Sequence, residues 1–270
     1  MTSNEEYNNG TDETDCTDAF EITEDMSPEV IMKRSQTEPC NIIEMVAAEC
    51  QDDFNQWMIA TSKYCNPLVL NILDCNEPWT IPNVFQNFKR LATLKLIGME
   101  YLECFPSSLF GIKTLKTLHL ECLECINKVP YRLNRLRNLE NLIIRDLYCL
   151  EEFPRKLGEL KELQYFEMTD CPNARIPEHF NNNSKLRTLK IVNTATASSS
   201  ILKILTQSLH DDCNVEIRNL SEGGEVTYNV LQEAINFCLD TNCIICPEVE
   251  VRQFTVEQIK CYLEQVDIKK

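Results

Sequence analysis

The stretch that decides the fold is LENLIIRDLYCLEEFPRKLGEL, residues 139–160. Its apolar residues first recur at about every second position, as in a strand, and later at every third or fourth position, as in a helix. Pro154 lies in the later part, where its fixed φ suits an extended return of the chain. We therefore predict a short strand, a turn and a helical or looser return within these residues.

The same pattern occurs several times along the chain. Copies begin at Leu91, Leu115, Leu139, Leu163 and Leu186, in steps of 24, 24, 24 and 23 residues, and a degenerate earlier copy begins at Pro67. The prolines keep the same register, at Pro82, Pro106, Pro130, Pro154 and Pro177. Leucines and prolines rarely align together by chance over more than a hundred residues, so residues 67–200 are expected to form a repeat array.

Each copy has two faces in its strand segment. Positions four and six lie on one side of the strand, and positions three, five and seven lie on the other. One copy buries too few apolar side chains to offset the entropy lost when its backbone is ordered. Each copy must therefore stack on its neighbours, which predicts a solenoid with a parallel sheet along one face.

The L-x-x-L-x-L motif at a period in the low twenties resembles the intracellular leucine-rich repeats of plant disease-resistance receptors and Ras-pathway scaffold proteins. The resemblance covers about half of the chain and implies an α/β fold, a leucine-rich repeat solenoid with a curved parallel β-sheet. It does not extend to function, because no nucleotide-binding domain accompanies the repeats. Position nine, which is asparagine in many such repeats, is occupied here by Cys75, Met99, Leu123, Leu147, Cys171 and Thr194. We interpret Cys75 and Cys171 as buried structural thiols.

A solenoid needs a cap at each end. Residues 40–66 are expected to be an N-terminal helical cap, because apolar residues from Ile42 to Met58 follow a helical stripe and Asn41 with Glu44 fits a capping box. An independent docking helix is the alternative. Residues 1–39 hold eleven acids and two bases, and we expect them to be a disordered acidic tail.

After residue 200 the pattern changes. The segments VEIRNL at residue 215 and VEVRQF at residue 249 read as two strands, each leading toward an apolar helix. Residues 201–270 are therefore expected to form longer β/α repeats or a cap that continues the sheet, similar to the larger repeats behind some F-box proteins. A separate small α/β domain is the alternative.

Composition restricts the partners and the compartment. The formal net charge of −16 disfavours nucleic acid and anionic membrane surfaces. The N-terminus lacks a secretory signal pattern, and no apolar run is long enough to span a bilayer. Fifteen cysteines then indicate reduced thiols, and we expect a cytoplasmic protein, with the nucleus left open.

Thr37 is a candidate phosphorylation site. The segment KRSQTEP, residues 33–39, resembles the R-S-x-T-x-P form that 14-3-3 proteins bind once the threonine is phosphorylated. Arg34 lies three residues before Thr37, where basophilic kinases recognise a base. A phosphate there adds charge and acceptor oxygens that an arginine cluster can bind.

Signals for catalysis and metal binding are weak. Neither G-x-x-x-x-G-K-[ST] nor G-x-G-x-x-G occurs, so we expect no cofactor and no enzymatic activity. Cys122 with Cys125 and Cys243 with Cys246 have zinc-like spacing, but the first pair falls inside a repeat and no metal is expected. His119 and Cys122 are the alternative, a Cys/His nucleophile, which would need the thiol and the imidazole within hydrogen-bond reach.

The remaining candidate is the concave face formed by positions three, five and seven. Its central residues are expected to bind a protein partner, and they are Thr117, His119, Glu121, Asn141, Ile143, Arg145, Tyr165, Glu167 and Thr169. The sequence thus predicts a non-catalytic interaction module or adaptor. The alternatives are an enzyme or substrate-receptor subunit of the ubiquitin system and an acidic binder of basic proteins such as histones.

Overall fold

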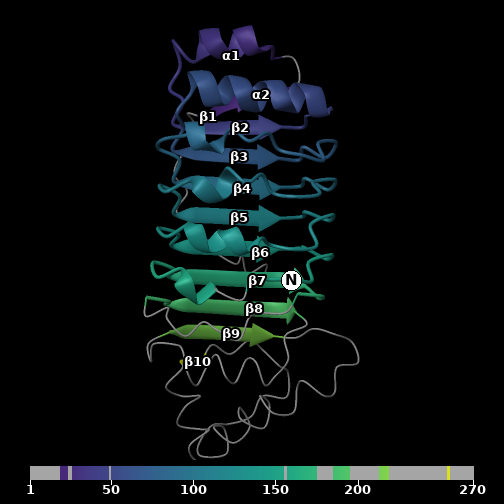
Figure 1. Cartoon of the computed structure of the whole chain (residues 1–270), viewed down its shortest axis with the longest axis vertical. Coiled ribbons are helices and arrows are strands. Elements are labelled where there is room, and N and C mark those ends of the chain that lie inside the picture. The colour runs from purple at the N-terminus through teal and green to yellow at the C-terminus, as the bar shows by residue number, and fades with distance from the viewer. Residues whose placement is uncertain are drawn as a thin grey trace, which may run out of the picture.

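The computed structural model describes residues 19–23, 26–48, 50–154, 157–174, 185–194, 213–218 and 254–255. Within them, ten strands form one sheet in which each strand pairs with its neighbours in chain order (Figure 1). The strands are β1 (Ala19–Ile22), β2 (Ile42–Val46), β3 (Val69–Leu73), β4 (Thr93–Ile97), β5 (Thr117–Glu121), β6 (Asn141–Arg145), β7 (Tyr165–Cys171), β8 (Thr188–Thr194), β9 (Asn214–Arg218) and β10 (Phe254–Thr255).

Strands β1 to β9 are parallel, and β10 pairs antiparallel with β9. Equivalent repeat positions pair across the sheet, so that Leu94 lies opposite Leu118, Leu118 opposite Leu142 and Leu142 opposite Phe166. The 24-residue spacing in the sequence therefore becomes register in the sheet. This confirms the predicted leucine-rich repeat solenoid.

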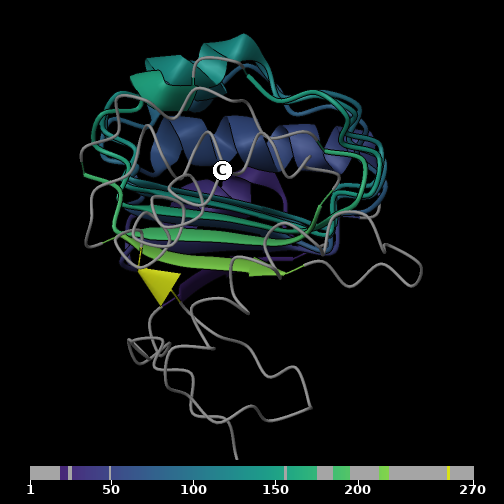
Figure 2. The same ribbon diagram turned by 90° about the horizontal axis from the view of Figure 1, so that it is seen from below.

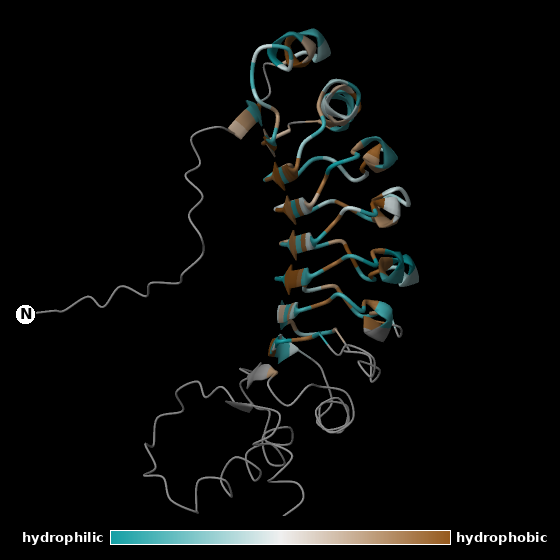
Figure 3. Ribbon diagram, turned by 90° about the vertical axis from the view of Figure 1, so that its left-hand side faces the viewer, coloured by the Kyte–Doolittle hydropathy of each residue, from teal (hydrophilic) through white to brown (hydrophobic). Residues whose placement is uncertain are grey.

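The described helices lie on one side of the sheet (Figure 2). They are α1 (Pro28–Arg34), α2 (Gln51–Tyr64) and the 3₁₀ turns η1 (Phe85–Asn87), η2 (Leu109–Gly111), η3 (Tyr131–Arg135) and η4 (Leu157–Glu159). The sheet curves so that its helix-free face is concave (Figure 3). Side chains at positions three, five and seven therefore lie on the open concave face.

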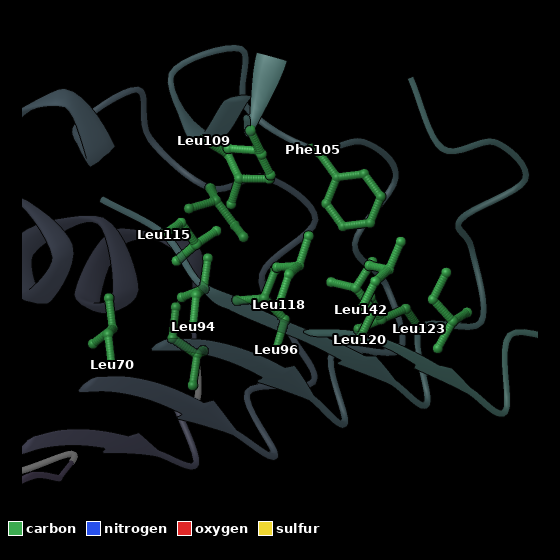
Figure 4. Close-up of a cluster of buried hydrophobic side chains, with 14 of the residues drawn as sticks. Leu70, Leu94, Leu96, Phe105, Leu109, Leu115, Leu118, Leu120, Leu123 and Leu142 are labelled. Atoms are coloured by element: carbon green, nitrogen blue, oxygen red, sulfur yellow. The ribbon is translucent and has the colours of Figure 1, made fainter. Parts of the chain in front are cut away.

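The core lies between the sheet and the returning segments. Leu118, Leu142 and Ile144 are at most 1% exposed, as the repeat pattern predicts. Figure 4 shows Leu118, Leu120 and Leu142 above the strands, where Phe105 and Leu109 approach them from a return. The prediction of buried thiols at Cys75 and Cys171 is confirmed, because both residues are 0% exposed.

A left-handed residue occupies repeat position eight at the carboxyl end of strands β2 to β8. It follows the last residue of β2 to β6 and is the second-to-last residue of β7 and β8. These residues are Ala47, Asp74, Gly98, Cys122, Asp146, Asp170 and Asn193, with φ between 51° and 67°. Asp and Asn accept this conformation more readily than most residues, and glycine accepts it without a steric cost. A Cβ at position 98 would also lie 2.5 Å from Asp74 Oδ1, so a larger residue there would displace the Asp74 side chain. In each repeat, the left-handed turn directs the chain from the sheet into the returning segment.

The prediction that a helix begins at residue 42 is wrong. Residues 42–46 form strand β2, and α2 begins only at Gln51, after Cys50 accepts a hydrogen bond from the backbone N–H of Asp53. Ile43 and Met45 are buried and lie opposite Leu70 and Ile72 of β3. Burial against the next repeat therefore decides this segment, and its apparent helical stripe does not.

The predicted disorder of residues 1–39 is also wrong for its described part. Strand β1 pairs parallel with β2, and Phe20 and Ile22 are buried. Helix α1 packs on α2, and Trp57 Nε1 donates a hydrogen bond to the carbonyl of Met26 at 3.0 Å. Acidic composition did not prevent order here because a few apolar residues complete the end of the core. Residues 1–18 lie outside the described part.

The sheet continues past residue 200. Strand β9 contains the first four residues of the predicted VEIRNL strand and pairs parallel with β8, in the register of the repeats. The second predicted strand, at residue 249, falls mostly outside the described residues, and its described end pairs antiparallel as β10. The apolar helices predicted after these two strands lie outside the described part, as do Cys243 and Cys246.

Candidate functional site on the concave face

The nine predicted binding residues come together on three neighbouring strands of the concave face. Strands β5, β6 and β7 place Thr117, Asn141 and Tyr165 in one row, and the next two rows are formed by His119, Ile143, Glu167 and by Glu121, Arg145, Thr169. Each row runs across the strands because the register is constant. The sequence pattern thus located the face correctly, and binding to it stays a prediction.

Glu167 is the centre of this face, and it is almost fully buried at 1% exposure. Arg145 donates two parallel hydrogen bonds to Glu167, from Nε to Oε1 and from Nη2 to Oε2, both at 3.0 Å. The Tyr165 hydroxyl donates to Oε2 at 2.6 Å, and Lys190 Nζ lies 3.1 Å from Oε1. Glu167 therefore organises its neighbours and is unavailable to a partner, which corrects its predicted role as a contact residue.

These donors stabilise the negative charge of Glu167. Burial acts to raise the pKa of the carboxyl, but the hydrogen bonds from Arg145, Tyr165 and Lys190 outweigh it and lower the pKa to about 2. The hydrogen bonds from Arg145 to Glu167 also raise the pKa of the Arg145 guanidinium above its ordinary value. The pair is therefore fully ionised at neutral pH, and the carboxylate fixes the guanidinium in one orientation.

A second carboxylate extends the network toward β5. Glu121 Oε2 lies 2.7 Å from His119 Nε2 and 3.8 Å from Arg145 Nη1. Burial lowers the pKa of His119, although Glu121 acts in the opposite direction. Both Glu121 and Arg145 remain partly exposed, at 25% and 39% of their side chains, so this end of the network is open to a partner.

The face extends beyond the predicted residues on both sides. Lys190 of β8 joins the Glu167 network, and Asn71 of β3 donates to Glu44 of β2 at 2.8 Å. Sequence reasoning missed the β2 part because residues 42–46 were assigned to a helix. The sequence does contain the signal for a strand here, because the apolar residues Ile43 and Met45 alternate with their neighbours in the same way as Leu70 and Ile72 of the next repeat.

His119 and Cys122 do not have the environment that a Cys/His nucleophile needs. His119 is bonded to Glu121, and burial together with the nearby acids Asp146 and Glu121 raises the pKa of the Cys122 thiol. A nucleophile needs the opposite, a thiolate stabilised by positive charge. Burial likewise raises the pKa of Cys65 and Cys171 to about 12. These observations disfavour a reactive thiol at Cys65, Cys122 and Cys171.

One group in the described part has the spacing of metal ligands. Ligand atoms of Glu121, Cys122 and Asp146 lie within 4.8 Å of one another at the carboxyl ends of β5 and β6. The predicted pairing of Cys122 with Cys125 does not appear in this group. Two half-exposed carboxylates and a protonated thiol are common on protein surfaces, so the group carries no metal assignment.

Thr37 lies in an ordered turn after α1. Its backbone N–H and its hydroxyl both donate to the carbonyl of Arg34, at 3.0 Å and 3.2 Å. Arg34 is itself engaged, because its guanidinium forks onto Glu38 and lies 4.6 Å from the centre of the Phe20 ring. The exposed Thr37 side chain is thus presented on a turn that Arg34 holds closed.

No protein-family model matches the chain, and no curated protein matches it. Among solved structures, the chain is similar to the leucine-rich repeat domain of the type III effector XopL, with 17% identity and a TM-score of 0.46 over 74% of this chain and 76% of that one. It is also similar to a Leptospira interrogans leucine-rich repeat protein, with 16% identity and a TM-score of 0.43 over 67% and 49% of the two chains.

A third similar structure is the leucine-rich repeat ectodomain of the Arabidopsis thaliana receptor kinase GASSHO1/SCHENGEN3, with 16% identity and a TM-score of 0.36. That match covers 58% of this chain and 22% of the receptor chain. At these identities the likeness concerns the fold alone. In the described part of the chain, no helix combines the length and the apolar character that a bilayer crossing requires.

Proposed function

Because the chain folds as a leucine-rich repeat solenoid, we propose that it is a non-catalytic interaction module that binds a protein partner on its concave face. The observation that carries the proposal is the open face of the parallel strands, on which alternate positions of β1 to β8 present polar, charged and aromatic side chains. We further propose that it works as a signalling adaptor in the cytoplasm. The ten described cysteines are all free thiols, which supports a reducing compartment.

The size of the face fits a protein partner. Nine strands about 4.8 Å apart span about 38 Å, and five residues per strand span about 17 Å. This area approaches the roughly 800 Å² that one partner contributes to a standard protein interface. A small ligand would use only a fraction of it, so an extended protein surface is the better match.

The Glu167 network supports recognition by keeping the face rigid. Arg145 is fixed on both sides, by Glu167 and by Glu121, while 39% of its side chain stays exposed. A partner that contacts Arg145 therefore loses little additional side-chain entropy on binding. Arginine and tyrosine are also the residue types that most often dominate interface energetics. We assign the central contacts to Arg145, Tyr165, Ile143 and Thr117.

The substitution Ile143→Arg tests this assignment. Ile143 is half-buried at the middle of the face, so a long cation there is expected to obstruct a docked partner without entering the core. We expect co-purification of bound proteins from the native cell to fall at least tenfold relative to the wild type. Gln86→Arg is the matched control, because Gln86 is exposed on the helix side of the sheet. Equal recovery with both variants would contradict the proposal.

Phosphorylation of Thr37 is the proposed regulation of this module. The phosphate would lie beside Glu38 and compete for Arg34, which is expected to loosen the turn that joins α1 to β2. We expect a phosphorylated peptide of residues 30–42 to bind a 14-3-3 protein about tenfold more tightly than the phosphorylated full chain, because the turn must open first. Fluorescence anisotropy measures both, with Thr37→Ala as control. No affinity of either form would end this part of the proposal.

A further inference from the structure

A row of positive charges follows the edge of the sheet at which the strands begin. Repeat position 23 is occupied by a base in five successive turns, Lys89, Lys113, Arg137, Lys161 and Lys185. Each residue lies three or four positions before the first residue of strands β4 to β8. All five are exposed. We call these five residues the basic edge; Figure 3 views the molecule from this side.

The turns of the basic edge are held in register. The side chain of Asn138 donates to the carbonyl of Lys113 at 2.7 Å, and the side chain of Asn66 accepts from the backbone N–H of Lys89 at 3.0 Å. Neighbouring strands are about 4.8 Å apart, so five turns place five cations along about 19 Å. Like charges at such spacing repel one another. Lys89 Nζ donates a hydrogen bond to the carbonyl of Gln86 at 2.7 Å, which offsets part of this repulsion.

Few acids in the described part compensate this charge. Lys185 pairs with Glu162, and the nearby Lys116 pairs with Glu140. Within the described residues, no salt bridge is formed by Lys113, Arg137 or Lys161. The opposite edge is acidic, since the left-handed turns there carry Asp74, Asp146 and Asp170.

The charge of the whole chain is divided in the same way. Residues 85–190 contain 17 Lys and Arg against 13 Asp and Glu, whereas the remaining residues contain 9 against 29. The basic edge is therefore a local positive region on a strongly acidic protein. At physiological salt the screening length is about 8 Å, so a ligand on this edge responds to the local charge more than to the total.

A groove opens beside the basic edge and shares two of its residues. It has a volume of about 1350 Å³ and lies between the return that follows β5 and the return that follows β6. Arg137 and Lys161 line it, together with Lys128 and Arg135. Apolar lining is supplied by Val129, Pro130, Tyr131, Phe153 and Pro154. The three acids at the groove are Glu152, Glu159 and Glu162, of which Glu159 accepts a hydrogen bond from Asn134 and Glu162 pairs with Lys185.

We propose that the basic edge and this groove form a second binding surface, for an extended acidic peptide segment that places one apolar side chain in the groove. A row of cations suits successive carboxylates, and the apolar lining suits an aromatic or aliphatic anchor. A nucleic acid strand can also stack a base on an exposed aromatic ring, but its long polyanionic backbone would meet the acidic remainder of the molecule. This surface is separate from the concave face and does not depend on the function proposed for it.

Peptide binding to the full chain tests the proposal. The probe is a fluorescent peptide with five glutamates on each side of one phenylalanine, measured at 0.15 M salt. We expect measurable binding that weakens as salt rises, and at least threefold weaker binding when alanine replaces the phenylalanine. Tyr131→Ala should remove that threefold preference, because the Tyr131 ring is 68% exposed at the groove and its loss leaves the core intact.

Charge reversal locates the site. Lys113→Glu with Lys161→Glu is expected to weaken peptide binding at least tenfold, while Lys33→Glu on the exposed side of α1 changes it less than twofold. An equal loss of peptide affinity in the two variants would mean a general charge effect and would contradict the proposed location of the site. Tighter binding of a twelve-nucleotide thymidine strand than of the peptide would overturn the assignment of the ligand class. Absence of peptide binding at millimolar concentration would overturn the proposal as a whole.

Discussion

Glu167→Gln is expected to lower the free energy of unfolding by about 3 kcal/mol at pH 7, because it removes the negative charge from a buried ion pair. Glutamine has nearly the same shape, so packing changes little. Its amide NH₂ would face donors of Arg145, Tyr165 or Lys190, which leaves hydrogen-bonding groups unpaired at a site with 1% exposure. Urea unfolding of the two proteins measures the difference.

The same substitution has a defined pH dependence. The folded-state pKa of Glu167 is about 2, below the ordinary value of 4.5, so the unfolded chain binds the proton more tightly. The stabilisation that ionised Glu167 contributes is complete above about pH 5 and is lost as the pH falls toward 2. Its size follows from about 1.4 kcal/mol per unit of pKa difference between the folded and unfolded states. The difference in unfolding free energy between wild type and Glu167→Gln should therefore narrow over that range. A difference that stays constant between pH 7 and pH 3 would contradict the account of the network.

Leu142→Ala is expected to cost about 3 kcal/mol of unfolding free energy. Leu142 is 0% exposed and lies between Leu118 and Phe166 in the middle of the stack, so its truncation leaves a cavity that the parallel strands cannot close. Urea unfolding at pH 7 measures the loss.

The matched control is the same substitution at an exposed leucine. Leu68 is 43% exposed just before β3, and Leu68→Ala should cost less than about 1 kcal/mol. Similar losses at the two positions would mean that the repeat interior does not carry the stability of the fold.

The central repeats could be predicted because one rule fixes both their strands and their burial. Leucines at positions four and six demand a buried side, and the 24-residue period demands that the same side recur in every copy, as Leu94, Leu118 and Leu142 show. The first two strands broke the period. The connection from Val46 to Val69 contains the full helix α2, so β1 and β2 stand outside the proline register that located the other copies.

The location of the candidate site was predictable, but the state of its residues was not. Alternation alone places Glu167 and Arg145 on the concave face. The burial of Glu167 arises from side chains on three strands, namely Arg145 on β6, Tyr165 on β7 and Lys190 on β8, which are up to 45 residues apart in sequence. Such cross-strand contacts depend on rotamers and distances that a repeat pattern does not encode. For this reason the sequence suggested an exposed acid where the structure contains a buried one.

The most direct test of the proposed interaction face is site-specific photocrosslinking in the native cell. A photoreactive phenylalanine analogue is introduced at Thr117 on the concave face in one protein and at Gln86 on the helix side in another. Irradiation is expected to link position 117 to a discrete protein partner, and the same product is expected to be absent from position 86. Discrete products from position 86 alone would contradict this expectation and would move the interaction to the other side of the solenoid.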